Sequence, residues 1–320
     1  MRIFSFLLLE ILLAPLTLSS LILLQLWTLT VSKQQQTSLT ALAPLFFRWL
    51  LHIQGIRPDE TTERLIDALP SLNTALCWGA VGPTLLAANL TGYTPSFLGV
   101  PASGEEDLGN MIHTRSLFFD TALTQYLATA EQVVLLGAGY DTRLFKFCSG
   151  LNLSLFEVDK RATQQAKIKA LKKSGIDLSE VAFVEVDFET EDWAEALQKL
   201  GFESSKRSFF LWEGVTYYLT EKAVRESLLK VTEMSAVGSA IAFDVFSPTF
   251  VSARSEWQWI QPAISLLKLV GEPFRFGINL QDQSFVEQLL ETTGLQIESF
   301  QTMGMLRGSA FSGLVVAEKS

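Results

Sequence analysis

The chain has 320 residues, 48% of them apolar, and a mean hydropathy of +0.26, which excludes an intrinsically disordered protein and is high for a purely soluble one. It carries 25 Lys and Arg against 34 Asp and Glu, a net charge of −9. Binding to nucleic acid needs a basic surface, so we expect no nucleic-acid partner. With two cysteines and two histidines, neither a disulfide framework nor a multi-histidine metal site is expected.

The chain begins with a long apolar segment. Between Ile3 and Val31 the only charged residue is Glu10. About 20 apolar residues in a helix span a bilayer, so residues 1–35 are predicted to be a membrane anchor helix. A cleaved signal peptide is one alternative, although the apolar run continues past the small residues at 19–20. A helix packed on the protein is the other.

Residues 36–104 are predicted to form a helical region. Residues 39–53 are apolar but carry Arg48, which favours an interfacial or buried helix. Residues 57–69 are typical of a short amphipathic helix that begins at Pro58. Residues 72–90 are uncharged, and they form either a second membrane span or a helix packed on the protein. More basic residues follow the first apolar segment than precede it, so we expect membrane association with the bulk of the chain in the cytoplasm.

From residue 105 onward, short apolar runs alternate with helical segments. The predicted strands are 132–136, 153–159, 181–186, 208–212, 239–245, 295–302 and 309–317, and the predicted helices between them are 160–174, 192–200, 221–235 and 284–293. Such alternation predicts an α/β fold, a parallel sheet with helices on both faces. The last two strands have no helix between them and indicate a C-terminal antiparallel hairpin. This is the Rossmann-like layout of class I methyltransferases.

In such sheets ligands bind beyond the carboxyl ends of the strands, so the residues found there are the candidates for a site. Gly137 and Gly139 follow the first strand and let the backbone approach a ligand; an ordinary strand-to-helix turn is the alternative. A third glycine of the dinucleotide pattern is absent, which weakens a pyrophosphate-binding interpretation but permits S-adenosylmethionine (SAM). Asp159, after the second strand, is placed to bind ribose hydroxyls or to cap a helix.

Two further strand ends carry candidate residues. Asp187 and Phe188, after the third strand, are placed to bind an adenine, with a helix cap again the alternative for the acid. Glu213 follows the fourth strand and is expected near a ligand's ammonium group. Upstream, Arg115 lies on a predicted helix, where it either pairs with a carboxylate or is a surface arginine.

These blocks together resemble the leucine carboxyl methyltransferase-like family of class I SAM-dependent O-methyltransferases. The resemblance covers about residues 105–320 and rests on Arg115 with Asp120 and on four short motifs, 134–143 (VLLGAGYDTR), 156–159 (FEVD), 186–188 (VDF) and 213–219 (EGVTYYL). Residues 57–60 and 85–93 of the chain are also similar to an N-terminal segment of some bacterial members of the family.

The resemblance implies the cofactor SAM and a role for each matching residue. Arg115 would hold the SAM carboxylate, Gly137 would line the methionine part, and Glu213 would lie by the amino-acid end. Asp159 would bind the ribose, and Asp187 with Phe188 the adenine. Asp141 and Arg143 belong to the signature without an assignable contact. The chain departs from the leucine carboxyl methyltransferases proper, because no N-terminal basic residue can be matched to the one that helps to anchor their cofactor.

The sequence predicts the chemical class of the methyl acceptor but not its identity. A carboxylate is already ionised at pH 7 and needs no general base, so the scarcity of histidine favours a carboxylate over a hydroxyl acceptor. Of the histidines, His113 is interpreted as a surface residue rather than a base. The catalytic residues are unassigned, with Glu213, Tyr217 and Tyr218 as positioning candidates. Residues 247–280 are predicted to be a lid insertion, with a packing insertion that covers the sheet as the alternative. A lid rich in aromatic residues beside a membrane anchor favours a lipophilic small molecule.

Two other functions share parts of this pattern. A nicotinamide-dependent oxidoreductase uses the same glycines and acidic residue, although the third glycine is missing. A non-catalytic membrane-anchored SAM-binding protein would have the same fold, because fold alone does not determine activity.

Overall fold

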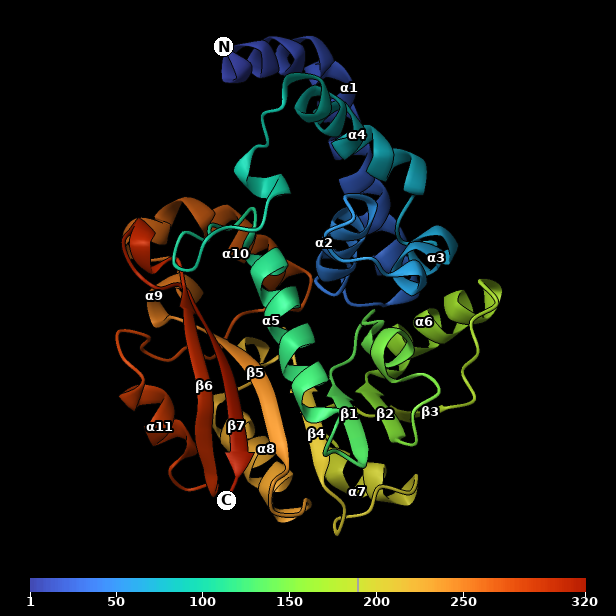
Figure 1. Ribbon diagram of the computed structural model, residues 1–320, viewed down its shortest axis with the longest axis vertical. Coiled ribbons are helices and arrows are strands. Elements are labelled where there is room, and N and C mark those ends of the chain that lie inside the picture. The colour runs from blue at the N-terminus through green and yellow to red at the C-terminus, as the bar shows by residue number, and fades with distance from the viewer. Residues whose placement is uncertain (189) are drawn as a thin grey trace.

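The computed structural model describes residues 1–188 and 190–320, and a seven-stranded sheet lies at its centre (Figure 1). The strands are β1 (Gln132–Leu136), β2 (Ser154–Asp159), β3 (Val181–Glu185), β4 (Ser208–Trp212), β5 (Ala240–Phe246), β6 (Leu295–Met303) and β7 (Ser312–Lys319). Their spatial order is β3-β2-β1-β4-β5-β7-β6. The first five strands run parallel, and β7 is antiparallel to both of its neighbours. The predicted fold class is confirmed.

The two strands of the C-terminal hairpin do not join the sheet in the order in which they follow along the chain. β7 inserts between β5 and β6, so the last strand of the chain is internal and β6 forms the edge. Burial explains this order. β7 is buried from Ser312 to Ala317, whereas β6 contains several exposed residues. A buried run needs cover on both faces and partners on both sides.

Helices cover both faces of the sheet. They are α5 (Met111–Tyr126), α6 (Arg161–Lys173), α7 (Trp193–Lys199), α8 (Glu221–Glu233), α9 (Pro248–Val251), α10 (Gln261–Leu269) and α11 (Ser284–Leu290). α7, α8 and α11 pack on one face. α5 and the segment around α9 and α10 pack on the other. The alternation seen in the sequence therefore yields a sheet with two separate apolar layers.

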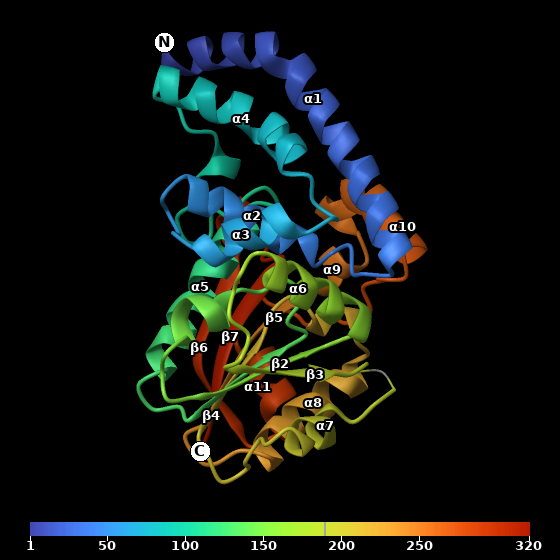
Figure 2. The same ribbon diagram turned by 90° about the vertical axis from the view of Figure 1, so that its right-hand side faces the viewer.

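Four further helices precede the sheet. They are α1 (Arg2–Gln35), α2 (Leu42–Ile53), α3 (Glu60–Ala68) and α4 (Thr74–Thr91). α2 and α3 pack with α6 and with Tyr140, beside the loop that follows β1. α4 lies along α1, away from the sheet (Figure 2). The limits of the domains and of the lid predicted from the sequence stay predictions.

The start of α3 differs from the prediction by two residues. The helix begins at Glu60, because the Asp59 side chain accepts a hydrogen bond from the backbone N–H of Thr62 and acts as the N-cap. Pro58 therefore lies just outside the helix. The residue that caps the helix, rather than the proline, sets its boundary.

A buried ion pair joins the sheet to α6. The Lys167 ammonium lies 2.7 Å from both carboxylate oxygens of Glu157, and both side chains are fully buried. Burial raises the pKa of Glu157 to about 7, although the lysine opposes that rise. A charge left alone at this position would be costly.

We expect Lys167→Met to lower the free energy of unfolding at pH 8 by about 3 kcal/mol, because it leaves the Glu157 carboxylate buried without a partner. The loss should be smaller at pH 5, where Glu157 takes up a proton. Urea unfolding measures both values. Lys199→Met is the matched control, since Lys199 and Glu195 form an exposed pair on α7, which typically contributes less than about 1 kcal/mol. An equal loss in both variants would contradict the prediction.

Candidate active site

A pocket of about 740 Å³ opens beyond the carboxyl ends of β1, β2, β3 and β4. The segment between α1 and α2 and the chain after α10 form its outer wall. Every candidate site residue named from the sequence lines it, namely Arg115, Gly137, Gly139, Asp159, Asp187, Phe188, Glu213, Tyr217 and Tyr218. The fold thus brings these residues together, while the role of each in binding stays a prediction.

The two glycines after β1 are required by geometry. Gly137 has a φ of +65°, and a Cβ there would lie 2.4 Å from Cγ2 of Val215. Gly139 has a φ of +49°, and a Cβ there would lie 3.2 Å from the Cβ of Ala41. A side chain at Gly137 would therefore clash with the loop after β4, and one at Gly139 would crowd the residue just before α2. The backbone at this turn is left open to a ligand.

Asp159 is held at the end of β2 by backbone groups. Its carboxylate accepts hydrogen bonds from the backbone N–H groups of Gly139 and Lys160, the latter at 2.6 Å. Burial raises the pKa of Asp159, and the two N–H groups oppose that rise. The carboxylate therefore lies at the pocket wall in a fixed orientation. It does not serve as an N-cap, because α6 shows no side-chain cap.

Asp187 and Phe188 lie at the same end of the pocket, after β3. The Lys160 ammonium is 3.2 Å from the Asp187 carboxylate. The half-buried Phe188 ring packs beside Trp193, with the ring centroids 6.4 Å apart. An acidic group and an aromatic ring thus line the pocket together with Asp159.

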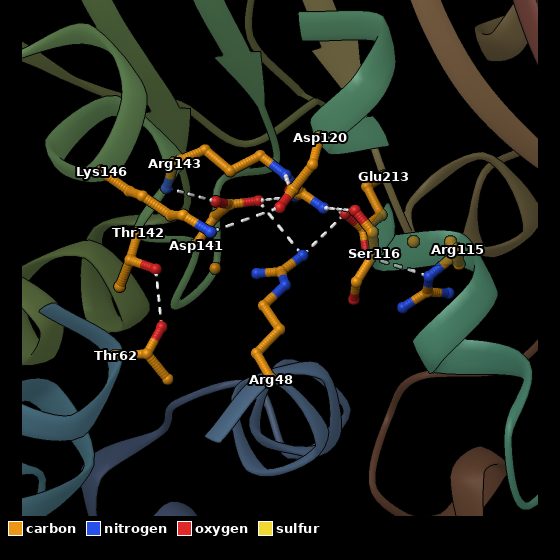
Figure 3. Close-up of polar contacts among 12 residues, drawn as sticks. Arg48, Thr62, Arg115, Ser116, Asp120, Asp141, Thr142, Arg143, Lys146 and Glu213 are labelled. Carbon is orange, nitrogen blue, oxygen red and sulfur yellow. Dashed lines mark hydrogen bonds and ion pairs between the residues drawn. The ribbon is translucent and has the colours of Figure 1, made fainter. Parts of the chain in front are cut away.

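At the other end, Glu213 accepts hydrogen bonds from three guanidinium groups (Figure 3). Arg115 Nε is 2.9 Å from Oε1, while Arg143 Nη1 and Arg48 Nη2 are 2.6 Å and 2.7 Å from Oε2. All four side chains are buried. These cations lower the pKa of Glu213 to about 2 despite its burial. The carboxylate is therefore ionised throughout the physiological pH range.

The structure also assigns contacts to the two signature residues that the sequence left open. Arg143 binds Asp141 on one side and Asp120 on the other, with Nε 2.7 Å from Asp120 Oδ1. Arg143 also donates a hydrogen bond of 3.0 Å to the carbonyl of Ser116 on α5. Arg143 and Arg48 keep the pKa of Asp141 well below its usual range. These two residues therefore fix the loop after β1 to α5.

A second buried network connects this loop to the N-terminal helices. Arg57 binds Asp59 at 2.6 Å and Asp120 at 2.7 Å, and all three side chains are buried or nearly so. The Thr142 hydroxyl donates to Asp59 at 2.8 Å and lies 2.8 Å from the Thr62 hydroxyl. The start of α3 is thereby docked onto the glycine loop.

Arg48 is the site residue that sequence reasoning missed. It projects from α2 into the space between Asp141 and Glu213 (Figure 3), and its Nε is buried without a hydrogen-bond partner. The sequence offers no match to the N-terminal basic residue of the leucine carboxyl methyltransferases, and in the structure Arg48 is an N-terminal basic residue that lines the pocket. The signal was present in the sequence as a single cation inside an apolar helix.

Neither histidine lines the pocket. His113 is fully buried, with Nδ1 3.0 Å from the carbonyl of Gly99, and burial lowers its pKa. The prediction of a surface residue is therefore wrong. His52 Nδ1 accepts a hydrogen bond from the backbone N–H of Asp59. Burial also raises the pKa values of Tyr217 and Tyr218.

Within residues 1–188 and 190–320, no group of three or more His, Cys, Asp and Glu side chains could hold a metal ion.

The strand order, with five parallel strands and a C-terminal antiparallel hairpin, is that of the class I methyltransferase fold. Within that class, residues 96–232 match the family described as leucine carboxyl methyltransferase. A Bacillus subtilis protein, YktD, named as a candidate SAM-dependent methyltransferase, is 33% identical over 170 residues, which cover 52% of this chain and 55% of that protein. A Mycobacteroides abscessus protein of the same description is 30% identical over 186 residues, covering 57% and 58%.

Solved structures give more distant likenesses. An O-methyltransferase family protein from Burkholderia thailandensis has a TM-score of 0.45 at 15% identity, covering 64% of this chain and 56% of that one. Geranyl diphosphate C-methyltransferase from Streptomyces coelicolor has a TM-score of 0.46 at 10% identity, covering 65% and 81%.

These findings confirm the family resemblance predicted from the sequence for the matched segment, and the relatives described above are themselves named as SAM-dependent methyltransferases. The chain spans about half the length of the curated relatives it matches. The matched segment begins at residue 96, so α1 to α4, with Arg48, lie outside it.

The charged cluster predicts a dependence of stability on pH. The folded-state pKa of Glu213, about 2, lies below the ordinary value of 4.5. Its stabilising effect is therefore present above pH 4.5 and is lost as the pH falls towards 2. Urea unfolding between pH 2 and pH 7 should show this fall, and Glu213→Gln should remove on the order of 3 kcal/mol of it. A variant with the pH profile of the original chain would contradict the assignment.

Proposed function

We propose that the protein is a membrane-associated SAM-dependent O-methyltransferase that methylates a carboxylate of a lipophilic small molecule, with its catalytic domain in the cytoplasm. The observation that carries the proposal is the pocket, which has nucleoside-binding features at one end and a cluster of arginines at the other. Its volume of about 740 Å³ is sufficient for a cofactor and part of an acceptor.

The residues present fit SAM. The buried, unpartnered Nε of Arg48 is a donor that a ligand carboxylate can satisfy, and Arg115 lies on the opposite side of Glu213. Leaving a buried donor unsatisfied is costly, which favours a ligand at this position. Gly137 would line the methionine part, because a side chain there would fill that space.

At the nucleoside end, Asp159 would accept hydrogen bonds from the ribose hydroxyls. Its orientation is already fixed by the N–H groups of Gly139 and Lys160. Asp187 and Phe188 would bind the adenine, with the ring of Phe188 held by Trp193. Bound SAM supplies a methyl group on an electrophilic sulfonium.

Charge distribution in the pocket favours a carboxylate acceptor. A hydroxyl acceptor needs a base that takes up its proton near neutral pH. The pKa values of Glu213 and Asp141 are too low for that role, and those of Tyr217 and Tyr218 are raised. Asp244, whose pKa burial raises to about 6, binds Arg115 and is fully buried behind the pocket. An ionised carboxylate needs only to be positioned and shielded from water.

The aromatic side chains next to the pocket support a lipophilic acceptor. Tyr217 stacks on Phe246 with the ring centroids 4.0 Å apart, and Phe274 contacts both rings. Tyr217 also accepts a hydrogen bond from Arg115 at 3.2 Å, so it is a positioning residue. The predicted lid contributes the chain from Leu269 to Pro273 to the pocket wall.

Membrane association is supported by α1. This helix is long and apolar enough to cross a bilayer, with a mean hydropathy of 2.3 over an 18-residue window that is only 6% buried. A nicotinamide-dependent oxidoreductase has no support among the relatives described above, whose names specify SAM.

We expect the full-length protein in detergent to bind SAM with micromolar affinity and to show no binding of NADH. Asp159→Ala should weaken SAM binding at least about tenfold, because one charge-assisted hydrogen-bond acceptor for the ribose is lost. Isothermal titration calorimetry measures these affinities. Asp177→Ala is the matched control, an exposed acidic residue that lies outside the pocket. Tight binding of NADH, or unchanged SAM binding by Asp159→Ala, would refute the proposed cofactor site.

The proposed acceptor chemistry predicts the product. Incubation with methyl-labelled SAM and a bacterial lipid extract should yield labelled methyl esters, which mild alkali hydrolyses to methanol. The rate should change little between about pH 6 and pH 9, because the acceptor is already ionised and its methylation needs no base. An alkali-stable methyl ether, or activity confined to small polar acids, would contradict the proposal.

A further inference from the structure

α1 and α4 pack as an antiparallel pair along most of α4 (Figure 2). Near one end, Trp27 Nε1 donates a hydrogen bond of 2.9 Å to the carbonyl of Pro70. In the middle, Gly79 lies against Ser20 so closely that a Cβ at Gly79 would be 2.2 Å from Ser20 Oγ. At the other end, the rings of Phe6 and Tyr93 are 5.0 Å apart.

The outer surface of this pair is apolar. We call it the hairpin surface, made by the exposed side chains of Ile3, Phe4, Leu7, Leu8, Ile11, Leu12, Leu16, Leu18, Leu21, Ile22, Leu23, Leu26 and Trp27 on α1 and of Trp78, Leu86 and Leu90 on α4. Exposed apolar patches of this extent mark contacts with a membrane or another protein. Basic residues lie near both ends of α1, Arg2 and Lys33, which complements anionic lipid headgroups.

Both ends of α4 are tied to the body of the protein. At its start, Leu69 and Leu72 are buried beside α3. At its end, Leu98 is buried in the same cluster as residues of α2 and α3, and the carbonyl of Gly99 is 3.0 Å from His113 on α5. Gly92 and Gly99 are seven residues apart, a distance of about 25 Å at full extension.

This connection is too short for the end of α4 to lie across a bilayer. The hydrocarbon core is about 30 Å thick, and irregular backbone is not tolerated in contact with lipid. The start of α1 lies at the same end of the pair, since the Arg2 guanidinium is 3.8 Å from where a Cβ of Gly92 would be. The start of α1 therefore stays on the side of the membrane where the catalytic domain lies.

We propose that α1 and α4 form a hairpin embedded in one leaflet of a phospholipid membrane, rather than a helix that crosses the membrane. The inference rests on the membrane association proposed above. The interior prolines Pro15 and Pro83 suit a pair that bends along the surface of the protein, as α1 does in Figure 2. Arg2 and Lys33 then both lie at the level of the headgroups.

This placement puts the mouth of the pocket at the membrane surface. Leu29 and Lys33, at the end of α1, line the pocket together with Leu269 and Val270 after α10. Leu269 is also one of the most exposed apolar side chains of the protein. The acceptor would then be an amphiphile that leaves its chain in the leaflet and presents its carboxylate beside the Lys33 ammonium.

Topology can be tested on the full-length protein with an epitope tag at its N-terminus and another at its C-terminus. In sealed inside-out vesicles from the expressing cells, an added protease should remove both tags without detergent. An N-terminal tag that becomes accessible only after detergent is added would show a crossing helix and overturn the inference, while leaving the proposed membrane association intact.

Variants test the hairpin surface itself. Leu12→Glu and Leu86→Glu should each reduce binding to sealed vesicles of phosphatidylethanolamine and phosphatidylglycerol at least about tenfold, with SAM binding unchanged. Leu200→Glu is the matched control, an exposed leucine at the end of α7. Absence of vesicle binding by the original chain would refute both the association and the hairpin. A change of oligomeric state in the variants at unchanged vesicle binding would mean that a second copy covers this surface.

Discussion

The structure depends on one carboxylate, that of Glu213, which binds the guanidinium groups of Arg48, Arg115 and Arg143. The four residues come from the loop after β4, from α2, from α5 and from the loop after β1, so this contact joins elements that are far apart in the sequence. Each cation is buried, and removing the shared acceptor would leave three buried charges short of a partner. Because the charges compensate one another only in this arrangement, the pocket and the packing of the N-terminal helices form together.

The N-terminal helices are consequently part of the site and not only an attachment. Arg48 reaches the pocket from α2, and Arg57 docks α3 onto the glycine loop through Asp59 and Asp120. The segment that matches the family begins at residue 96, so the residues that close the pocket belong to a part of the chain outside that match. Chains with the same central sheet can therefore differ in what they hold at the mouth of the pocket.

Local patterns predicted the sheet and the positions of the candidate residues. The apolar runs and the residues at their ends suffice for this, because a parallel sheet brings the carboxyl ends of its strands to one edge. They predict a terminal hairpin but do not show that β7 is its internal strand, inserted beside β5. They also do not show where Arg48 points, since its partner Glu213 lies 165 residues away. The place of His113 near a polar linker predicts exposure, because it gives no sign of the Phe47 ring on α2 that packs against it.

That separation along the chain also bears on synthesis. At a synthesis rate of about 5 to 20 residues per second, Glu213 leaves the ribosome roughly 10 to 30 s after Arg48 does. During this interval α1 and α2 precede the complete sheet, and Arg48 is without its Glu213 partner. The apolar helix is thus available to the membrane before its own domain can cover any part of it. The order in which the chain emerges therefore favours attachment first and completion of the pocket afterwards.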